Sequence, residues 1–93
     1  FFRALRFSLV ASRGGIMRAR ILRALMDKPL NPLTLSKKLN IDYKTATHHL
    51  DKLLKQNMVV KSGNEYGAQY HVTFTPDQRA AFEEMVSEMG ESL

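Results

Sequence analysis

Apolar residues recur every three to four positions along most of the chain, which is the spacing of an amphipathic helix. This spacing predicts a first helix over residues 2–11 and a second over residues 16–27, separated by Gly14-Gly15. Pro29 ends the second helix, because the residue before a proline is disfavoured in the helical conformation. The first third of the chain is therefore expected to be a pair of helices.

Two further helices follow, and capping residues mark their ends. Asn31 is a favourable N-cap, and the proline after it suits the first turn of a helix over residues 32–39. Asn40 tolerates the left-handed conformation that often ends a helix, and Asp42 is an N-cap for the next helix, over residues 43–57. The buried side of this longer helix is expected to be aliphatic and its opposite side polar.

After residue 57 the apolar period changes from 3.6 to 2, which is typical of strands. Strands are predicted over residues 58–61 and 68–74, joined by a polar tip that contains glycine. The sequence Thr75-Pro76-Asp77-Gln78 then combines a capping box with a proline in the first turn. It predicts a final helix within residues 75–93.

The third and fourth helices form a candidate helix-turn-helix, with Asn40-Ile41-Asp42 as its tight turn. The small residues Ser36 and Ala46 lie where the two helices would approach closely. The hairpin that follows completes a winged helix. We therefore predict one α+β, mainly α, domain over residues 1–93: a winged helix-turn-helix with a two-stranded wing and a flanking helix at each end.

A helix-turn-helix places the N-terminus of its second helix in the major groove, where polar side chains contact base edges and nearby cations contact phosphates. The residues expected to meet the bases are Tyr43, Lys44, Thr45, Thr47 and His48. The residues expected to meet the DNA backbone are Lys37, Lys38, Lys44, Lys52 and Lys55, with Lys61 and Asn64 in the wing. The wing carries Glu65 and no arginine, so deep insertion into the minor groove is not expected.

Charge is distributed unevenly along the chain, whose formal net charge is +5 and whose pI is about 9.8. Residues 1–61 hold thirteen of the fourteen basic residues and three of the nine acidic ones, a net charge of +10. Residues 62–93 hold one basic and six acidic residues, a net charge of −5. A basic body suits a polyanion, most simply nucleic acid.

Several classes of function lack the residues they need. The chain has no Cys, which excludes disulfides, thiolate metal sites and a cysteine nucleophile, and favours a reducing, cytoplasmic setting. No apolar run approaches the ~20 residues of a membrane span, so no membrane contact is expected from this segment. Without a glycine-rich phosphate loop or an activated nucleophile, we expect no enzyme, cofactor or metal. Because the chain begins with Phe1 rather than Met, we expect it to be an excised segment.

The sequence resembles the ArsR-type winged-helix transcriptional regulators over residues 16–74. Three motifs carry the resemblance: Leu35-Ser-Lys-Lys-Leu39-Asn-Ile41, then Thr45-Ala-Thr-His-His-Leu50-Asp-Lys-Leu53, then Met58-Val-Val-Lys61 with Tyr70-His-Val-Thr73. The second motif is the most specific, because it looks like the family's recognition helix, rich in serine or threonine and ending in a His-Leu pair.

The resemblance implies a homodimer that binds a pseudo-palindromic stretch of double-stranded DNA, with the first and last helices forming the dimer interface. The family's metal sites do not carry over. One needs Cys, which is lacking, and the other needs a histidine in the last helix, whereas His71 is the last histidine of the chain. Metal sensing is therefore not expected, and no small-molecule effector is indicated.

Apolar stripes in the two terminal helices also favour a dimer, because a domain this small already fills its core with the aliphatic residues of its middle helices. The helices expected to form the interface lie within residues 1–13 and 75–93, flanking a core over residues 16–74. The interface residues predicted in this way are Phe2, Leu5, Leu9, Phe82, Met85, Val86 and Met89.

Some single residues allow two interpretations. His48 and His49 are neighbours on a helix and point about 100° apart, so they cannot bind one metal ion together. His49 is expected to be a packed, hydrogen-bonded residue and His48 a DNA contact. Tyr43 either stacks on the DNA backbone or covers the turn, and Lys37 and Lys38 either bind phosphate or are simply solvated.

Two other functions remain open, because a fold does not fix a function. The domain could be a protein–protein interaction module, with Arg18, Arg20 and Arg23 facing an acidic partner. It could also bind RNA. The acidic side chains of the last helix, Glu83, Glu84 and Glu88, are expected to form a solvated face.

Overall fold

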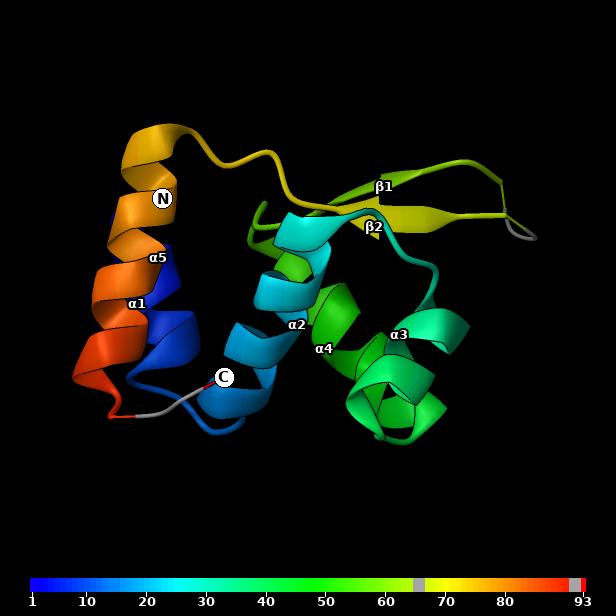
Figure 1. Ribbon diagram of the computed structural model, residues 1–93, viewed down its shortest axis with the longest axis horizontal. Coiled ribbons are helices and arrows are strands. Elements are labelled where there is room, and N and C mark those ends of the chain that lie inside the picture. Colours follow the sequence, from blue (N-terminus) through cyan, green and yellow to red (C-terminus); the bar gives the residue numbers. More distant parts are fainter. Residues whose placement is uncertain (65–66, 91–92) are drawn as a thin grey trace.

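The computed structural model describes residues 1–64, 67–90 and 93. Within these residues the chain forms five helices and one antiparallel pair of strands (Figure 1). In chain order they are α1 (Phe2–Leu9), α2 (Gly15–Asp27), α3 (Pro32–Leu39), α4 (Tyr43–Lys55), β1 (Val60–Ser62), β2 (Gln69–His71) and α5 (Pro76–Glu88). The predicted fold class, a mainly helical winged helix-turn-helix with a two-stranded wing, is confirmed.

The predicted helix caps are present. Asn31 and Asp42 accept hydrogen bonds on their side chains from backbone N–H groups three residues later, at 2.8 Å and 3.3 Å. Asn40 ends α3 in the left-handed conformation, with φ of 54°. Thr75 and Gln78 form the reciprocal bonds of a capping box at the start of α5. These bonds satisfy N–H groups that the helices themselves leave without partners.

Two helices and both strands are shorter than the sequence predicts. Helix α1 ends at Leu9, and α4 ends at Lys55 because Asn57 turns left-handed, with φ of 59°, and the next N–H bonds back to Leu53 at 2.9 Å. The strands pair only over Val60–Ser62 and Gln69–His71. On either side of this short ladder, Met58, Val59 and Phe74 turn into the core instead of extending the sheet.

The helices divide into two ends joined by α2 (Figure 1). Helices α1 and α5 pack side by side at one end, while α3, α4 and the β1–β2 hairpin occupy the other. An isolated bridge ties the hairpin to the α2–α3 loop, because Leu30 and Tyr70 exchange backbone hydrogen bonds of 3.1 Å and 2.9 Å. The wing is therefore fastened to the helical body at its base.

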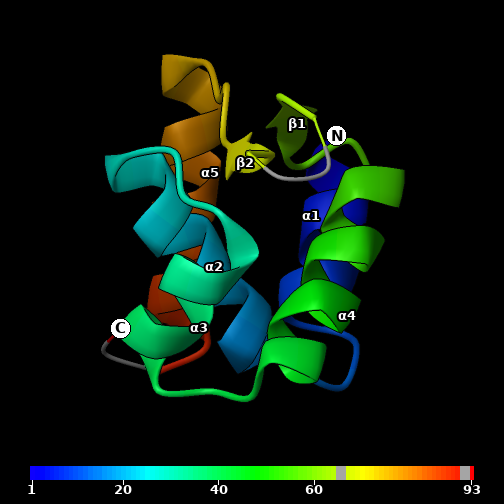
Figure 2. The same ribbon diagram turned by 90° about the vertical axis from the view of Figure 1, so that its right-hand side faces the viewer.

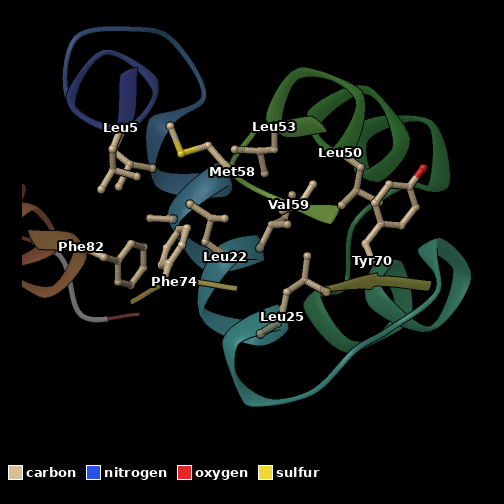
Figure 3. Close-up of a cluster of buried hydrophobic side chains, with 14 of the residues drawn as sticks. Leu5, Leu22, Leu25, Leu50, Leu53, Met58, Val59, Tyr70, Phe74 and Phe82 are labelled. Atoms are coloured by element: carbon tan, nitrogen blue, oxygen red, sulfur yellow. The ribbon is translucent and has the colours of Figure 1, made fainter. Parts of the chain in front are cut away.

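One hydrophobic core runs through both ends (Figure 3). Leu5 and Phe82 close it between α1 and α5, and Leu50 packs near Tyr70 at the base of the wing. Leu22 of α2 lies between these groups. The terminal helices are thus part of the same folded unit as the helix-turn-helix.

The structure corrects the argument that the terminal stripes need a second chain. Helices α1 and α5 cover each other's apolar side. The residues that are buried in this way, within one chain, are Leu5, Leu9, Phe82, Met85 and Val86. Of the seven predicted interface residues, only Phe2, which is 51 % exposed, and the half-buried Met89 keep accessible apolar surface. Two amphipathic helices of one chain suffice to bury both stripes.

Gly14 and Gly15 form the close junction between α1 and α2. Gly14 has φ of 79°, a conformation that other residues rarely adopt. A Cβ atom on Gly15 would lie 1.9 Å from the carbonyl oxygen of Leu9. This approach requires glycine and fixes how α1 enters the fold.

We expect Gly15→Ala to lower the free energy of unfolding by about 1–3 kcal/mol, because the added methyl group must displace backbone. Urea denaturation measured by circular dichroism tests this. Gly67→Ala is the control, since its Cβ would meet only the Asn64 side chain, at 3.8 Å. Equal stability of the two variants would contradict the close packing at Gly15.

Candidate nucleic-acid interface

The helix-turn-helix and the hairpin share one side of the molecule (Figure 2). The contact between α3 and α4 uses the two small residues that the sequence suggested. Ser36 is buried and its hydroxyl donates to the carbonyl of Leu33 at 2.7 Å, and Ala46 is fully buried. Because neither side chain keeps the helices apart, α4 packs closely on α3. The N-terminus of α4, at Tyr43, directly follows the turn that joins the two helices.

Helix α4 separates a buried side from an exposed one. Ala46, His49, Leu50 and Leu53 are buried. The predicted DNA-contacting residues of this helix lie at its surface: Tyr43, Lys44, Thr45, His48, Lys52 and Lys55 are exposed, and Thr47 is half-buried. The Thr47 hydroxyl donates to the carbonyl of Lys44 at 3.0 Å. The polar side predicted from the sequence is therefore accessible along the whole helix.

A cleft of about 320 Å³ joins this helix to the wing. It brings together three predicted residues, Tyr43, Thr47 and Lys61, although Lys61 lies on β1. The Lys61 ammonium group sits 5.7 Å from the centre of the Tyr70 ring. Asp51 also lines the cleft and adds a negative charge to it.

The remaining predicted residues lie apart from the cleft. Lys37 is exposed on α3, whereas Lys38 lies 3.9 Å from a carboxylate oxygen of Asp27 and lines a different groove. At the wing tip, Asn64 accepts the N–H of Gly67 on its side-chain oxygen, at 3.0 Å. Glu65, which bore on the depth of insertion, is outside the described residues.

The acidic residues Glu83, Glu84 and Glu88 of α5 are exposed, as the sequence predicts, and two of them also form ion pairs that the sequence does not show. Glu88 pairs with Arg6 of α1 at 3.1 Å. Glu83 pairs with both terminal nitrogens of Arg23, whose guanidinium lies 5.1 Å from the Phe82 ring centre. The pairs form because α5 packs beside basic helices, and a sequence does not show this proximity.

This pairing leaves most positive charge of the helix-turn-helix unneutralised. Among the described residues, the lysines of α3, α4 and β1 that form no ion pair are Lys37, Lys44, Lys52, Lys55 and Lys61. They surround the polar side of α4 and the base of the wing. Such a group of exposed cations attracts phosphate.

Arg18 is buried, at 2 % exposure, which corrects the idea that it faces an acidic partner. Its Nε and Nη2 both donate to the carbonyl of Ser8, at 2.9 Å and 2.7 Å. Nη2 also donates to the Ser12 hydroxyl and to the Arg13 carbonyl, each at 2.6 Å. Nη1 contacts Nδ1 of His49 at 3.3 Å. Arg18 therefore joins α1, the α1–α2 loop and α4.

His49 is packed and hydrogen-bonded, as predicted. Because a guanidinium only donates, Nδ1 of His49 accepts the Arg18 bond. Burial lowers the pKa of His49 below its ordinary value of 6.5, and the charges of Arg18, His48 and Lys52 lower it further. The imidazole is therefore neutral at pH 7, whereas the exposed His48 ring, centred 5.5 Å away, faces solvent.

Two contributors to this surface escaped the sequence analysis. Tyr70 lines the cleft and holds Lys61, and its only sequence signal is its inward position in an alternating strand. Leu33, at the start of α3, lines the same cleft and is 53 % exposed. An apolar residue in a first helical turn gives no signal that it will remain exposed.

Among the described residues there is neither a metal-binding cluster nor a membrane-spanning helix. These residues contain no group of three or more His, Asp or Glu side chains able to hold a metal ion. Within the same residues, no helix combines the length and the apolar content needed to cross a membrane.

Known structures of similar fold are winged-helix proteins. The transcriptional regulator BldR of Sulfolobus solfataricus superimposes with a TM-score of 0.69 at 17 % identity, over 96 % of this chain and 63 % of its own. Oxidised MarR of E. coli superimposes with a TM-score of 0.67 at 22 % identity, over 96 % of this chain and 65 % of MarR. NolR of Sinorhizobium fredii superimposes with a TM-score of 0.69 at 19 % identity, over 98 % of this chain and 87 % of NolR. The chain thus spans less than two thirds of the first two.

The sequence itself matches a family model. No curated protein matches the chain. Residues 17–61, from the first turn of α2 into β1, match the model of the bacterial regulatory proteins of the arsR family. By its fold the chain is a winged-helix protein, and its residues 17–61 match the model of the arsR family.

Proposed function

We propose that this chain binds double-stranded DNA in a sequence-specific manner and acts as a transcriptional regulator. The observation that carries the proposal is the group of exposed, unpaired lysines around the polar side of α4. The family match over residues 17–61 supports the same function. The helix-turn-helix and the wing lie on one side of the molecule (Figure 2), and the five unpaired lysines belong to these elements.

In this proposal the N-terminal half of α4 enters the major groove. Tyr43, Lys44, Thr45, Thr47 and His48 contact base edges there, because their side chains offer donors and acceptors beside the helix N-terminus. The phosphate contacts come from Lys37, Lys38, Lys44, Lys52 and Lys55, with Lys44 near both the bases and the backbone. The hairpin, residues 58–74, lies on the adjacent backbone, with Lys61 at its base and Asn64 at its tip.

We also propose that the chain acts as a homodimer, which would place two α4 helices on a pseudo-palindromic site. Exposed apolar side chains near the α1–α2 junction support this: Phe7 is 58 %, Ile16 48 % and Val10 42 % exposed. Val10 and Ile16 line one groove with Met89, a predicted interface residue that keeps accessible surface, whereas Phe2, the other such residue, lies at the far end of α1. The contact would therefore use the outer side of the terminal helices.

The alternative of a protein–protein interaction module has less support. Of the three arginines that suggested an acidic partner, Arg18 is buried and Arg23 pairs with Glu83. Arg20 is the one that no described carboxylate pairs with. One half-buried arginine is a weak basis for a partner surface.

A salt titration of binding to random-sequence duplex DNA tests the proposed function. Counting only the five unpaired lysines as phosphate contacts, we expect the logarithm of the binding constant to fall against the logarithm of salt concentration with a slope of about −4.5 per chain. Fluorescence anisotropy of a labelled duplex measures it. Absence of binding even at low salt would reject the proposal and favour a protein partner.

Replacement of Lys52 should remove one phosphate contact. We expect Lys52→Gln to weaken binding to all DNA sequences by a similar factor and to reduce the salt slope by about 1. Arg79→Gln is the control: it removes the same charge from an exposed site on α5, away from the helix-turn-helix. A loss confined to one DNA sequence would contradict the phosphate role of Lys52.

Replacement of Thr47 should instead change sequence preference. Thr47→Val keeps the shape and removes the hydroxyl, so we expect discrimination against single-base changes in a selected site to fall by about 1–3 kcal/mol. Thr73→Val, at an exposed position outside the cleft, is the control. If Thr47→Val discriminates as wild type does, the proposed base-contacting side of α4 is wrong.

A further inference from the structure

Arg18 is a buried cation that has only neutral partners. Its acceptors are two backbone carbonyls, two hydroxyls and an imidazole nitrogen. No described carboxylate forms an ion pair with it. A buried charge is costly, and an apolar side chain of similar volume would avoid that cost. What the guanidinium adds is geometry, because its fixed fork of donors holds several groups in one arrangement.

The groups held by this fork belong to three parts of the chain. Ser8 is near the end of α1, Ser12 and Arg13 are in the loop, and His49 is on α4. The bond to His49 is the only one that reaches the helix-turn-helix. It meets the buried side of α4, one residue after His48 and two after Thr47, which are proposed DNA contacts.

We propose that Arg18 positions α4 for DNA binding through Nδ1 of His49, and that this tie holds only while His49 is neutral. Arg18 and His49 are positioning residues here, since neither reaches the DNA-facing surface. The inference rests on the proposed function of α4. It adds a dependence of DNA binding on pH that neither the fold nor the family match implies.

Protonation of His49 would break the tie directly. An imidazolium carries N–H on both ring nitrogens and cannot accept the bond from Nη1 of Arg18. The contact of 3.3 Å would then place two positive groups against each other.

The charged groups that face His49 would not relieve this repulsion. They are Arg18 of α2, and His48 and Lys52 of α4, and each lowers the pKa of the ring. Within the described part of the chain no carboxylate contributes to this pKa, so no described acidic side chain stabilises the imidazolium.

One edge of the ring is packed against backbone. A Cβ atom on Gly14 would lie 2.8 Å from Cε1 of His49, so the ring edge packs on the backbone that caps α2. The N-terminus of a helix is itself partially positive, which further disfavours a charged ring at that place. Protonation must therefore shift α4 or the α1–α2 loop, and the base-contacting side chains move with α4.

The direction of the pH effect follows from the lowered pKa of His49. The unfolded chain binds a proton at this residue near pH 6.5, whereas the folded chain does so only at lower pH. Stability from the neutral ring is therefore complete above about pH 6.5 and is lost as the pH falls from there through the lower, folded-state pKa. The affinity for DNA should fall over the same pH range, because the bond between Arg18 and His49 that positions α4 needs a neutral ring.

His49→Asn is the informative variant, because its Oδ1 lies near the position of Nδ1 and accepts a hydrogen bond without titrating. In the free protein, we expect backbone amide resonances of residues 10–14 and 46–52 to shift together between pH 7.5 and 5 in wild type. We expect no such joint shift in His49→Asn. His71→Asn, on β2, removes another histidine and should behave as wild type does.

The affinity for a duplex is then measured at constant ionic strength over the same pH range. We expect the affinity of wild type to fall relative to that of His49→Asn as the pH is lowered below 6.5, by at most tenfold per pH unit because one proton is involved. Because wild type and His49→Asn both keep the exposed His48, its effect on DNA binding cancels from this comparison. His71→Asn controls for the loss of a histidine elsewhere and should follow wild type.

Two results would overturn the inference: coincident pH profiles of wild type and His49→Asn, or loop amides that do not follow His49. Failure of both proteins to bind DNA at any pH would instead reject the proposed function and the DNA role of Arg18 with it. The amide titration would still decide whether the contact between Arg18 and His49 depends on a neutral ring.

Discussion

The fold depends on the way the Arg18 guanidinium is satisfied. A buried cation without a carboxylate is tolerated only where neutral acceptors surround it, and here they come from α1, the α1–α2 loop and α4. The carbonyl of Ser8 that takes two of these bonds lies in the last turn of α1, where unsatisfied carbonyl groups favour a cation. The two glycines let the chain turn back tightly enough for this to happen. Removal of one acceptor therefore affects the placement of three segments at once.

The same packing organises the charge of the molecule. Helix α5 covers the apolar side of α1 and, from there, places Glu88 beside Arg6 and Glu83 beside Arg23. Exposed pairs of this kind contribute little stability. Their larger effect is electrostatic, because the acidic end of the sequence neutralises arginines of α1 and α2 and leaves the lysines around α4 unpaired. The basic body seen in the sequence thus becomes a basic side of the molecule.

The structure also changes where a partner chain would bind. The sequence pattern suggested that the apolar stripes of both terminal helices need a second chain to cover them. Leu5 and Phe82 are instead buried in the core of a single chain. The accessible apolar surface lies instead around Phe7, Val10 and Ile16, at the α1–α2 junction. A dimer contact at this place would lie next to the α1–α2 loop, which holds the Arg18 side chain. The proposed dimer interface is therefore adjacent to the proposed contact between Arg18 and α4.

The sequence by itself determined the local structure: the caps at Asn31, Asp42 and Thr75, the left-handed Asn40, and the separation of α4 into aliphatic and polar sides. These features depend on neighbours within a few residues, so spacing and residue type suffice to predict them. Only the tertiary structure decided that Arg18 is buried, that Glu83 and Glu88 are paired, and that Lys61 joins Tyr43 and Thr47 in one cleft. Each of these contacts joins residues from different elements. Their chemistry is set by which surfaces the packing brings together, and local sequence does not contain that information.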